Sequence, residues 1–365
     1  MLMPKSPAGP APKLPSLDLG RFGAAMLVVC FHMSFMVLDK TGQEPLGMIF
    51  RGGHSGVEYF FILSGFIILW THRKDINHPR QVARFAEKRA ARIIPLLWLT
   101  LIGWGLLRLA LPADPGDQLT PANLVSDLLL LPHDGNQTLG VTWTLRREAI
   151  FYMIFAMMIW RGAIGIPLMI VWQLLVVAQA ATKFFTVGPE PGMLLGITNI
   201  GFGLGMAIAV IIPRFKIRNG GPLLIFGVLM YLGVMVAEWL SDTPLDAGAR
   251  PWGATFNTLL YLSAACLVVM GMVVHDLERA KLPGERSRLI KLLGDSSYAL
   301  YLVHLPFGSI AIRIMQPFLP TETLMPLLCI GAVLASVIVH LLIEKPALAW
   351  FRDHRDRRAK KLAVA

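Results

Sequence analysis

This chain contains ten apolar stretches, and they restrict the folds that it can adopt. Several fall short of the roughly 20 residues that a helix needs to cross a membrane, notably the second and fourth, but helices that turn polar groups toward a protein interior can be short. In a chain that is 55% hydrophobic and 16% charged, the pattern predicts an all-α integral membrane protein of about ten helices and excludes soluble folds. The stretches are 22–38, 57–71, 93–111, 144–160, 163–181, 196–212, 222–240, 254–274, 297–316 and 324–343.

The loop charges predict which way the chain crosses the membrane. With the N-terminus inside, 26 of the 34 Lys and Arg residues fall in cytoplasmic segments. Cytoplasmic loops of membrane proteins carry such an excess, so we expect both termini in the cytoplasm. The net charge of +11 then has a topological cause, and a nucleic-acid partner is not needed to explain it.

The sequence indicates a single membrane domain without internal repeats. Residues 1–20 are polar and Pro-rich and lack a small-residue cleavage site, which indicates a retained cytoplasmic tail before a domain over 21–346. Residues 347–365 form a basic C-terminal tail, which we expect to lie against anionic lipid head groups. The three cysteines lie inside apolar runs with no paired spacing, so neither a disulfide framework nor a metal site is predicted.

The first apolar run carries two polar residues on one helical face. Arg21 and His32 are eleven residues apart, which is three turns plus about 20° and about 16 Å along the axis. An arginine at the membrane edge therefore places His32 near mid-bilayer. An ionisable residue at that depth is a functional candidate. The alternative is a buried imidazole that is hydrogen-bonded to a neighbouring helix.

The second run combines a carboxylate with small residues in an aromatic helix. Ser64 and Gly65 permit close approach of another helix or a narrow ligand, and plain packing is the simpler interpretation. Glu58 lies at the outer edge of the span, where a carboxylate needs water, a cation or a proton. We therefore treat Glu58 and Ser64 as residues of a substrate path or of a structural polar group.

A basic segment precedes the third span. Arg84, Lys88 and Arg92 have i, i+4, i+8 spacing, so a helix would align them as one cationic stripe with Arg89 beside it. Such a stripe can hold the phosphates of a nucleotide-like cofactor. Membrane topology alone also places basic residues there, so both interpretations stay open.

Two further spans carry polar groups. Glu148 stands beside Arg146 and Arg147 near a helix start, where a capping or salt-bridge role competes with an acid/base role. Tyr301 and His304 follow Ser297 along one face of a later helix, which indicates an interhelical network or the lining of a polar cavity.

The last span ends with a pair of ionisable residues and a proline. His340 and Glu344 have i, i+4 spacing and are expected to form a structural pair. Pro346 is expected to end the helix.

Taken together, these stretches resemble the membrane acyltransferase 3 family, the O-acyltransferases that modify bacterial surface polysaccharides. Each fragment is loose, but their ordered combination over nearly the whole chain is specific. Besides Arg21 and His32, the fragments are 53–66, 89–95, 143–152, 297–304 and 344–346. The resemblance implies a multi-pass protein of the bacterial inner membrane, with acyl-CoA on the cytoplasmic side and an acceptor hydroxyl outside. It also implies an acetyl-CoA or other acyl-CoA donor with no tightly bound cofactor, and a polysaccharide or lipid-linked glycan as acceptor.

Roles for the candidate residues follow from that resemblance. His32 would act as the base that takes the proton of the acceptor hydroxyl, or as a transient acyl carrier. Arg21 would contact the cofactor or hold a carboxylate, and Glu148 joins these two as a catalytic candidate. The residues expected to bind the phosphates of CoA are Arg84, Lys88, Arg89 and Arg92.

Two alternatives belong to other classes. A transporter or flippase would use His32, Glu58 and Glu148 as a proton or substrate relay, although such folds often show repeated halves that are not evident here. A non-catalytic scaffold in a polysaccharide assembly complex would leave the product unchanged when His32 is replaced by alanine.

Overall fold

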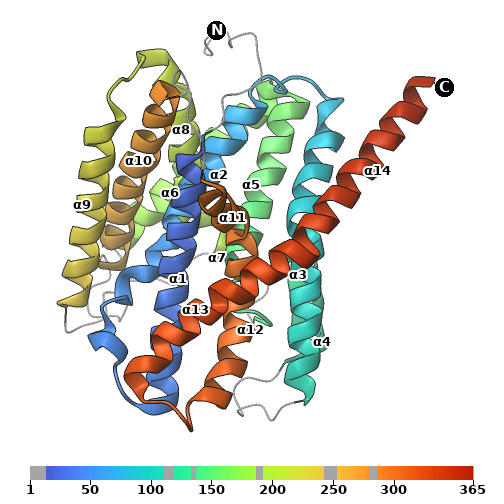
Figure 1. The fold of residues 1–365 in the computed structure, drawn as a ribbon. Coiled ribbons are helices and arrows are strands. Elements are labelled where there is room, and N and C mark those ends of the chain that lie inside the picture. The colour runs from blue at the N-terminus through green and yellow to red at the C-terminus, as the bar shows by residue number, and fades with distance from the viewer. Residues whose placement is uncertain are drawn as a thin grey trace.

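The computed structural model describes residues 14–110, 119–132, 137–185, 192–241, 253–279 and 287–364. These residues form helices and connecting turns with no strand among them (Figure 1). The all-α prediction is therefore confirmed for the part of the chain that is described. The α-helices are α1 Ser16–Thr41, α2 Gly56–His72, α3 Gln81–Ala110, α4 Pro121–Leu128, α5 Thr142–Trp160, α6 Gly162–Phe185, α7 Gly192–Leu195, α8 Ile200–Phe215, α9 Gly220–Trp239, α10 Gly253–Arg279, α11 Arg288–Asp295, α12 Ser297–Met315, α13 Thr321–Val339 and α14 Lys345–Val364. Short helical turns are η1 Pro45–Met48, η2 Arg51–Ser55, η3 Ile197–Asn199 and the π-helix η4 His340–Glu344.

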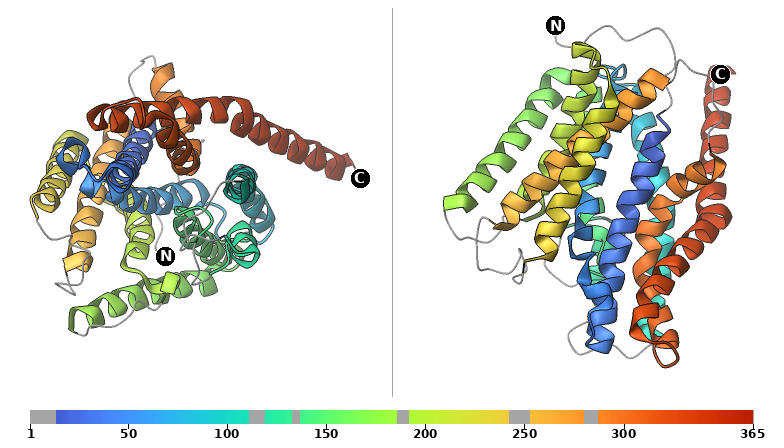
Figure 2. Two further views of the ribbon diagram at one scale, coloured as in Figure 1. Left: turned by 90° about the horizontal axis from the view of Figure 1, so that it is seen from below. Right: turned by 60° about the vertical axis from the view of Figure 1, so that its left-hand side comes forward.

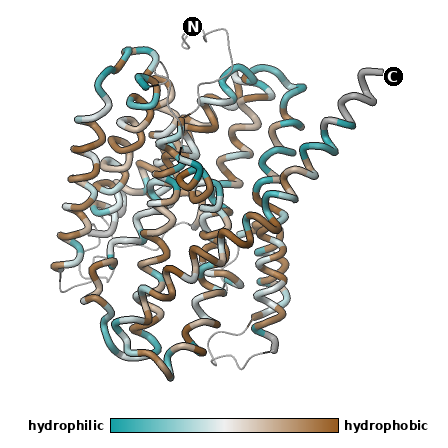
Figure 3. The backbone as a smooth tube through the Cα atoms, viewed as in Figure 1, coloured by the Kyte–Doolittle hydropathy of each residue, from teal (hydrophilic) through white to brown (hydrophobic). Residues whose placement is uncertain are grey.

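Within the described ranges, nine helical segments are long and apolar enough to cross a membrane. Hydrophobic residues run along the middle of these helices, and hydrophilic residues gather at the turns (Figure 3). The remaining predicted span, 144–160, is present as helix α5, and its first two turns carry Arg146, Arg147 and Glu148. These three charges within 19 residues keep α5 out of the group of nine, so partners inside the protein must compensate for them.

Helix α1 lies between two hydrophobic clusters, and each of its two faces joins one of them. Seen from below, it lies beside α2 and α13 (Figure 2). Ala25, Val29 and Met33 recur every four residues and pack with α12 and α13. Ala24 and Val28 belong to the larger cluster, which includes α2, α5, α8 and α10. Polar residues of α1 are therefore held between these helices.

Helix α2 makes the close approach that its small residues predict. The backbone of Phe202 in α8 lies directly against Gly65, so a side chain at that position would collide with it. Phe61 and Phe202 also stack, with ring centroids 4.6 Å apart. The packing interpretation of the Ser-Gly helix is confirmed for Gly65.

Helix α3 includes the basic segment, because it begins at Gln81 and continues through Pro95 to Ala110. The predicted alignment of basic side chains on a helix is therefore confirmed. Trp98 of α3 donates a hydrogen bond to the Leu128 carbonyl of α4, at 2.8 Å. Residues 111–118 and 133–136, on either side of α4, lie outside the described residues.

The prediction that Pro346 ends the last membrane helix is wrong. Helix α13 passes through the π-helical turn His340–Glu344 into α14, which extends away from the bundle (Figure 1). Proline cannot donate to the carbonyl four residues earlier, and it clashes with that carbonyl in a regular helix. A wider π turn immediately before α14 gives the proline a position near the start of a helical segment, where it is tolerated.

Candidate active site

A cavity of about 380 Å³ lies among α1, α2, α3, α5, α12, the start of α14 and the end of α11, where Asp295 lines it. Its walls combine apolar residues, such as Phe60 and Ile67 of α2, with charged and hydroxyl side chains from the other helices. The most distant of these lining residues, Arg21 and Leu348, are 327 positions apart in the sequence, and the helix packing brings them together. The predicted site residues that line the cavity are Arg21, Ser64, Lys88, Arg89, Arg92, Glu148 and Tyr301.

Four of these residues make one side of the cavity cationic. Arg21 of α1 joins Lys88, Arg89 and Arg92 of α3, and the only carboxylate within 4.0 Å of the Arg21 guanidinium among described residues is that of Asp18. Arg89 lies over the rings of Phe85 and Tyr152. Arg84 belongs to the same helical stripe but does not line this cavity.

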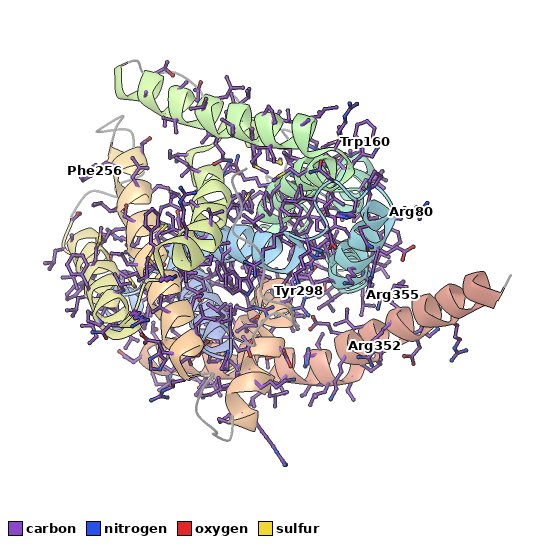
Figure 4. The ribbon with its side chains drawn as sticks, turned by 90° about the horizontal axis from the view of Figure 1, so that it is seen from above. Arg80, Trp160, Phe256, Tyr298, Arg352 and Arg355 are labelled. Carbon is purple, nitrogen blue, oxygen red and sulfur yellow. The ribbon has the colours of Figure 1, made fainter. Side chains whose placement is uncertain are left out.

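Arg92 is held by a carboxylate from the far end of the chain. Its Nη1 atom donates to Oε1 of Glu344 at 2.8 Å, and Oε2 of Glu344 lies 2.7 Å from Nδ1 of His340. The Arg92 guanidinium also lies over the ring of Tyr298, which is visible in the middle of the bundle in Figure 4. The predicted pair of His340 and Glu344 is confirmed, and Arg92 is its third member.

Glu148 projects into the cavity with one oxygen bound and the other available. Ser64 and Tyr152 both donate to its Oε1 atom, at 2.9 and 2.5 Å. Glu148 is the seventh residue of α5, and it forms no ion pair with Arg146, Arg147 or any other described residue. The helix-capping and salt-bridge interpretations of Glu148 are therefore wrong, because the helix begins two turns earlier.

Tyr301 lines the cavity and also contacts one of a pair of histidines that lie outside the cavity lining. Its hydroxyl lies 2.7 Å from that of Thr144, and its ring contacts His304 with centroids 6.2 Å apart. His304 is fully buried, and its Nε2 lies 3.0 Å from Nδ1 of the half-buried His32. Neither histidine lines the cavity. The interhelical network predicted for Tyr301 and His304 is confirmed, and Tyr301 also lines the cavity.

The hydrogen bonds of the histidine pair define which nitrogen carries hydrogen. Nδ1 of His304 lies 3.0 Å from the Leu300 carbonyl, which can only accept. In the neutral pair, Nδ1 of His304 therefore carries hydrogen and its Nε2 accepts from Nδ1 of His32. This leaves the lone pair of His32 on Nε2, where it can receive a proton.

Glu58 lies in a second polar cluster, away from the cavity. It is buried, and its Oε2 atom has no hydrogen-bond partner among the described residues. Nearby, Glu238 of α9 accepts from Tyr261 at 2.7 Å and lies 3.0 Å from Nε2 of His54. Sequence reasoning missed this pair, although a glutamate inside an apolar run of α9 was a signal of it.

The charged start of α5 is held by another residue that sequence reasoning did not single out as a partner. Arg146 forms an ion pair with Asp127 of α4, and both side chains are almost fully buried. The Asp127 carboxylate also accepts from the Thr138 backbone at 2.6 Å and from the Thr142 hydroxyl at 3.2 Å. Burial of two opposite charges together explains how α5 can hold an arginine among apolar helices.

Comparison with known proteins identifies the family to which this chain belongs. A family model described as an acyltransferase domain matches residues 14–343. The chain belongs to this acyltransferase family. It is 26% identical to the acyltransferase MdmB of Streptomyces mycarofaciens over 92% of both chains. It is 27% identical to the exopolysaccharide production protein ExoZ of Rhizobium meliloti, over 89% of this chain and 96% of that one. Identity to the peptidoglycan O-acetyltransferase OatA of Listeria monocytogenes is 22%, over 83% of this chain and 50% of that one. No solved structure matches.

The match confirms the family resemblance and the enzyme class. The protein is a multi-pass membrane acyltransferase, and the transporter alternative is not favoured. Among the described residues, no group of three or more His, Cys, Asp or Glu side chains could hold a metal ion.

Proposed function

We propose that this acyltransferase moves an acyl group, most simply acetyl, from cytoplasmic acyl-CoA to a hydroxyl of a surface or exported polysaccharide. The acceptor is a polysaccharide or a lipid-linked glycan, and the protein lies in the bacterial inner membrane with both termini in the cytoplasm. The relatives named for exopolysaccharide production and for peptidoglycan O-acetylation support an acceptor of this class.

The observation that carries the proposal is one cavity with cations on one side and hydrogen-bonding groups deeper among the helices. Lys88 and Arg89 form no ion pair with another described residue, so their charges are available to phosphates. Ser64, Glu148 and Tyr301 line the same cavity, where they can orient a thioester. A long donor with phosphates at one end and a reactive carbonyl at the other fits this distribution.

In the proposed reaction, the acceptor oxygen attacks the thioester carbonyl while Nε2 of His32 takes the hydroxyl proton. The carbon–sulfur bond breaks, CoA leaves as a thiolate, and the proton on His32 neutralises that thiolate. The hydrogen bond from Nδ1 of His32 to His304 supports this role, because it keeps the Nε2 lone pair available. Since His32 does not line the cavity, the carbonyl must pass Tyr301 to reach it.

A transient acyl-histidine uses the same geometry. In this two-step reaction, Nε2 of His32 attacks the thioester first, and the acceptor hydroxyl then receives the acyl group from the imidazole. Trapping the protein with a labelled acyl-CoA in the absence of acceptor distinguishes the two, because only the acyl-histidine route leaves label on His32.

The test is mass spectrometry of cell-surface glycan from cells with the gene deleted, restored, or restored as His32→Ala at matched membrane abundance. An ester mass that appears only with the unmodified protein supports both the transfer and the role of His32, and the mass identifies the acyl group. Full restoration of the ester by His32→Ala removes the role of His32. Absence of any gene-dependent ester overturns the proposed function.

A further inference from the structure

A second cavity lies beside the first, at the end of the bundle where α2 is connected to α3. It has a volume of about 260 Å³. Lys88 and Arg89 line both cavities, so the two adjoin along one face of α3. Arg84, which does not line the main cavity, lines the second one. The cationic stripe of α3 therefore runs past both spaces.

The lining of the second cavity is more polar than that of the first. Thr71 and Gln81 bring a hydroxyl and an amide, and His72 lies 2.7 Å from the Asp75 carboxylate. The His72 ring meets the ring of Phe85 edge to face, with centroids 5.1 Å apart. Groups of this kind hydrogen-bond to a heterocyclic base and a sugar and pack against their faces.

The positive charge here exceeds the negative charge. Arg84, Lys88 and Arg89 form no ion pair with another described residue. The Nε atom of Arg89 is buried and has no hydrogen-bond partner among them. The Asp75 carboxylate lines the same cavity and is already engaged by His72. Such an excess at a cavity favours a polyanionic ligand.

We infer that the second cavity is the nucleotide subsite of the donor: it binds the phosphorylated adenosine part of acyl-CoA, while the main cavity takes the pantetheine arm. This inference rests on the proposed donor. Lys88 and Arg89, which border both spaces, would hold the phosphates at the junction, and Arg84 would bind only the nucleotide part. Replacing Arg84 thus distinguishes a site with separate nucleotide and pantetheine parts from a single basic site that binds all the phosphates alike.

The experiment measures binding of radiolabelled CoA to the full-length protein in lipid nanodiscs, with unlabelled CoA and 4′-phosphopantetheine as competitors. Neither probe requires the acceptor or the transfer step. The variants are Arg84→Ala, Arg84→Lys and Arg80→Ala. Arg80 is exposed at the same end of the molecule and lines neither cavity, so it controls for the loss of one charge (Figure 4).

We expect Arg84→Ala to weaken CoA binding about tenfold, as the loss of one charge-assisted hydrogen bond does, and to leave binding of 4′-phosphopantetheine unchanged. Arg84→Lys should recover part of the loss, and Arg80→Ala should bind both probes normally. Equal weakening of both probes by Arg84→Ala, or of neither, overturns the inference. Failure of the unmodified protein to bind CoA at all overturns the proposed donor instead.

Discussion

The Nε2 atom of His304 lies 3.0 Å from the Nδ1 atom of His32, although the two residues are 272 positions apart. The contact joins helix α1 to α12, two helices that pack along the same hydrophobic cluster. One imidazole is fully buried and anchored to its own helix, and the other is half-buried. The pair therefore has a fixed member and a member that can react.

Replacing His304 with alanine should lower the rate of acyl transfer at saturating acyl-CoA by about 10²-fold, the smaller end of what a positioned base contributes. The physical reason is loss of the acceptor for Nδ1–H of His32, which frees that ring to rotate and to change tautomer. The KM for acyl-CoA should not change, because His304 does not line the cavity. Rates and KM are measured on membranes with a fixed glycan acceptor.

His304→Gln is the matched control, since its amide oxygen can accept from His32 and should recover part of the rate. A change in KM alone, or a full rate in His304→Ala, would assign His304 to packing and not to the orientation of His32.

Glu148 gives a second prediction about activity. Glu148→Gln keeps the shape and the acceptor atom for Ser64 and Tyr152 but removes the charge. If the carboxylate takes part in proton transfer, the rate should fall by about 10²-fold or more. Ser64→Ala removes one of the two hydrogen bonds to the carboxylate and keeps its charge and its bond to Tyr152. A hydrogen bond to a charged group contributes about 1.5 kcal/mol or more, so we expect a loss of about tenfold. Similar modest losses in both variants would mean that Glu148 only orients its neighbours.

The buried ion pair of Arg146 and Asp127 gives a prediction about stability. Asp127→Ala removes the carboxylate that pairs with the buried Arg146 guanidinium, and breaking such a pair typically costs about 3–5 kcal/mol of folding free energy. Thermal unfolding in detergent should show a lower midpoint for this variant. The double variant Asp127→Leu, Arg146→Met buries no charge and should recover much of the loss. If the double variant is no more stable than Asp127→Ala, hydrogen bonds of Asp127 to Thr138 and Thr142 outweigh the ion pair.

Periodicity and charge predict the helices of this protein better than they predict its site. The apolar runs and the i, i+4 spacing in α3 fix the elements, because each depends on a few neighbouring residues. The spacing of Arg21 and His32 on one face also holds, yet only Arg21 lines the cavity. Which residues of this helical face line the cavity depends on how α2 and α12 pack against α1. The local sequence pattern does not contain that information.

Long-range polar partners are the main part that sequence reasoning missed. Glu344 was assigned to His340, its neighbour on the helix, and its second oxygen binds Arg92 from 252 positions away. Asp127 lies in the short helix α4, outside the predicted spans, and it is the partner of Arg146. Charges inside apolar runs indicate that a partner exists, but only the fold shows which one.

The contact of Gly65 with α8 gives a prediction that tests the packing around the cavity. A methyl group at this position would meet the backbone of Phe202, which cannot move away as a flexible side chain can. Gly65→Ala should therefore destabilise the protein by about 1–3 kcal/mol, the usual cost of overpacking. It should also lower activity, because the adjacent Ser64 lines the cavity and would shift with α2.

Gly103→Ala is the matched control, since Gly103 also lies within a helix and a methyl group there would meet nothing within 4 Å. Alanine is the better helix former, so this variant should be as stable as the unmodified protein or up to about 1 kcal/mol more stable. Thermal unfolding of both variants in the same detergent measures the difference. Equal midpoints would show that α2 and α8 are less closely packed at Gly65 than their backbones indicate.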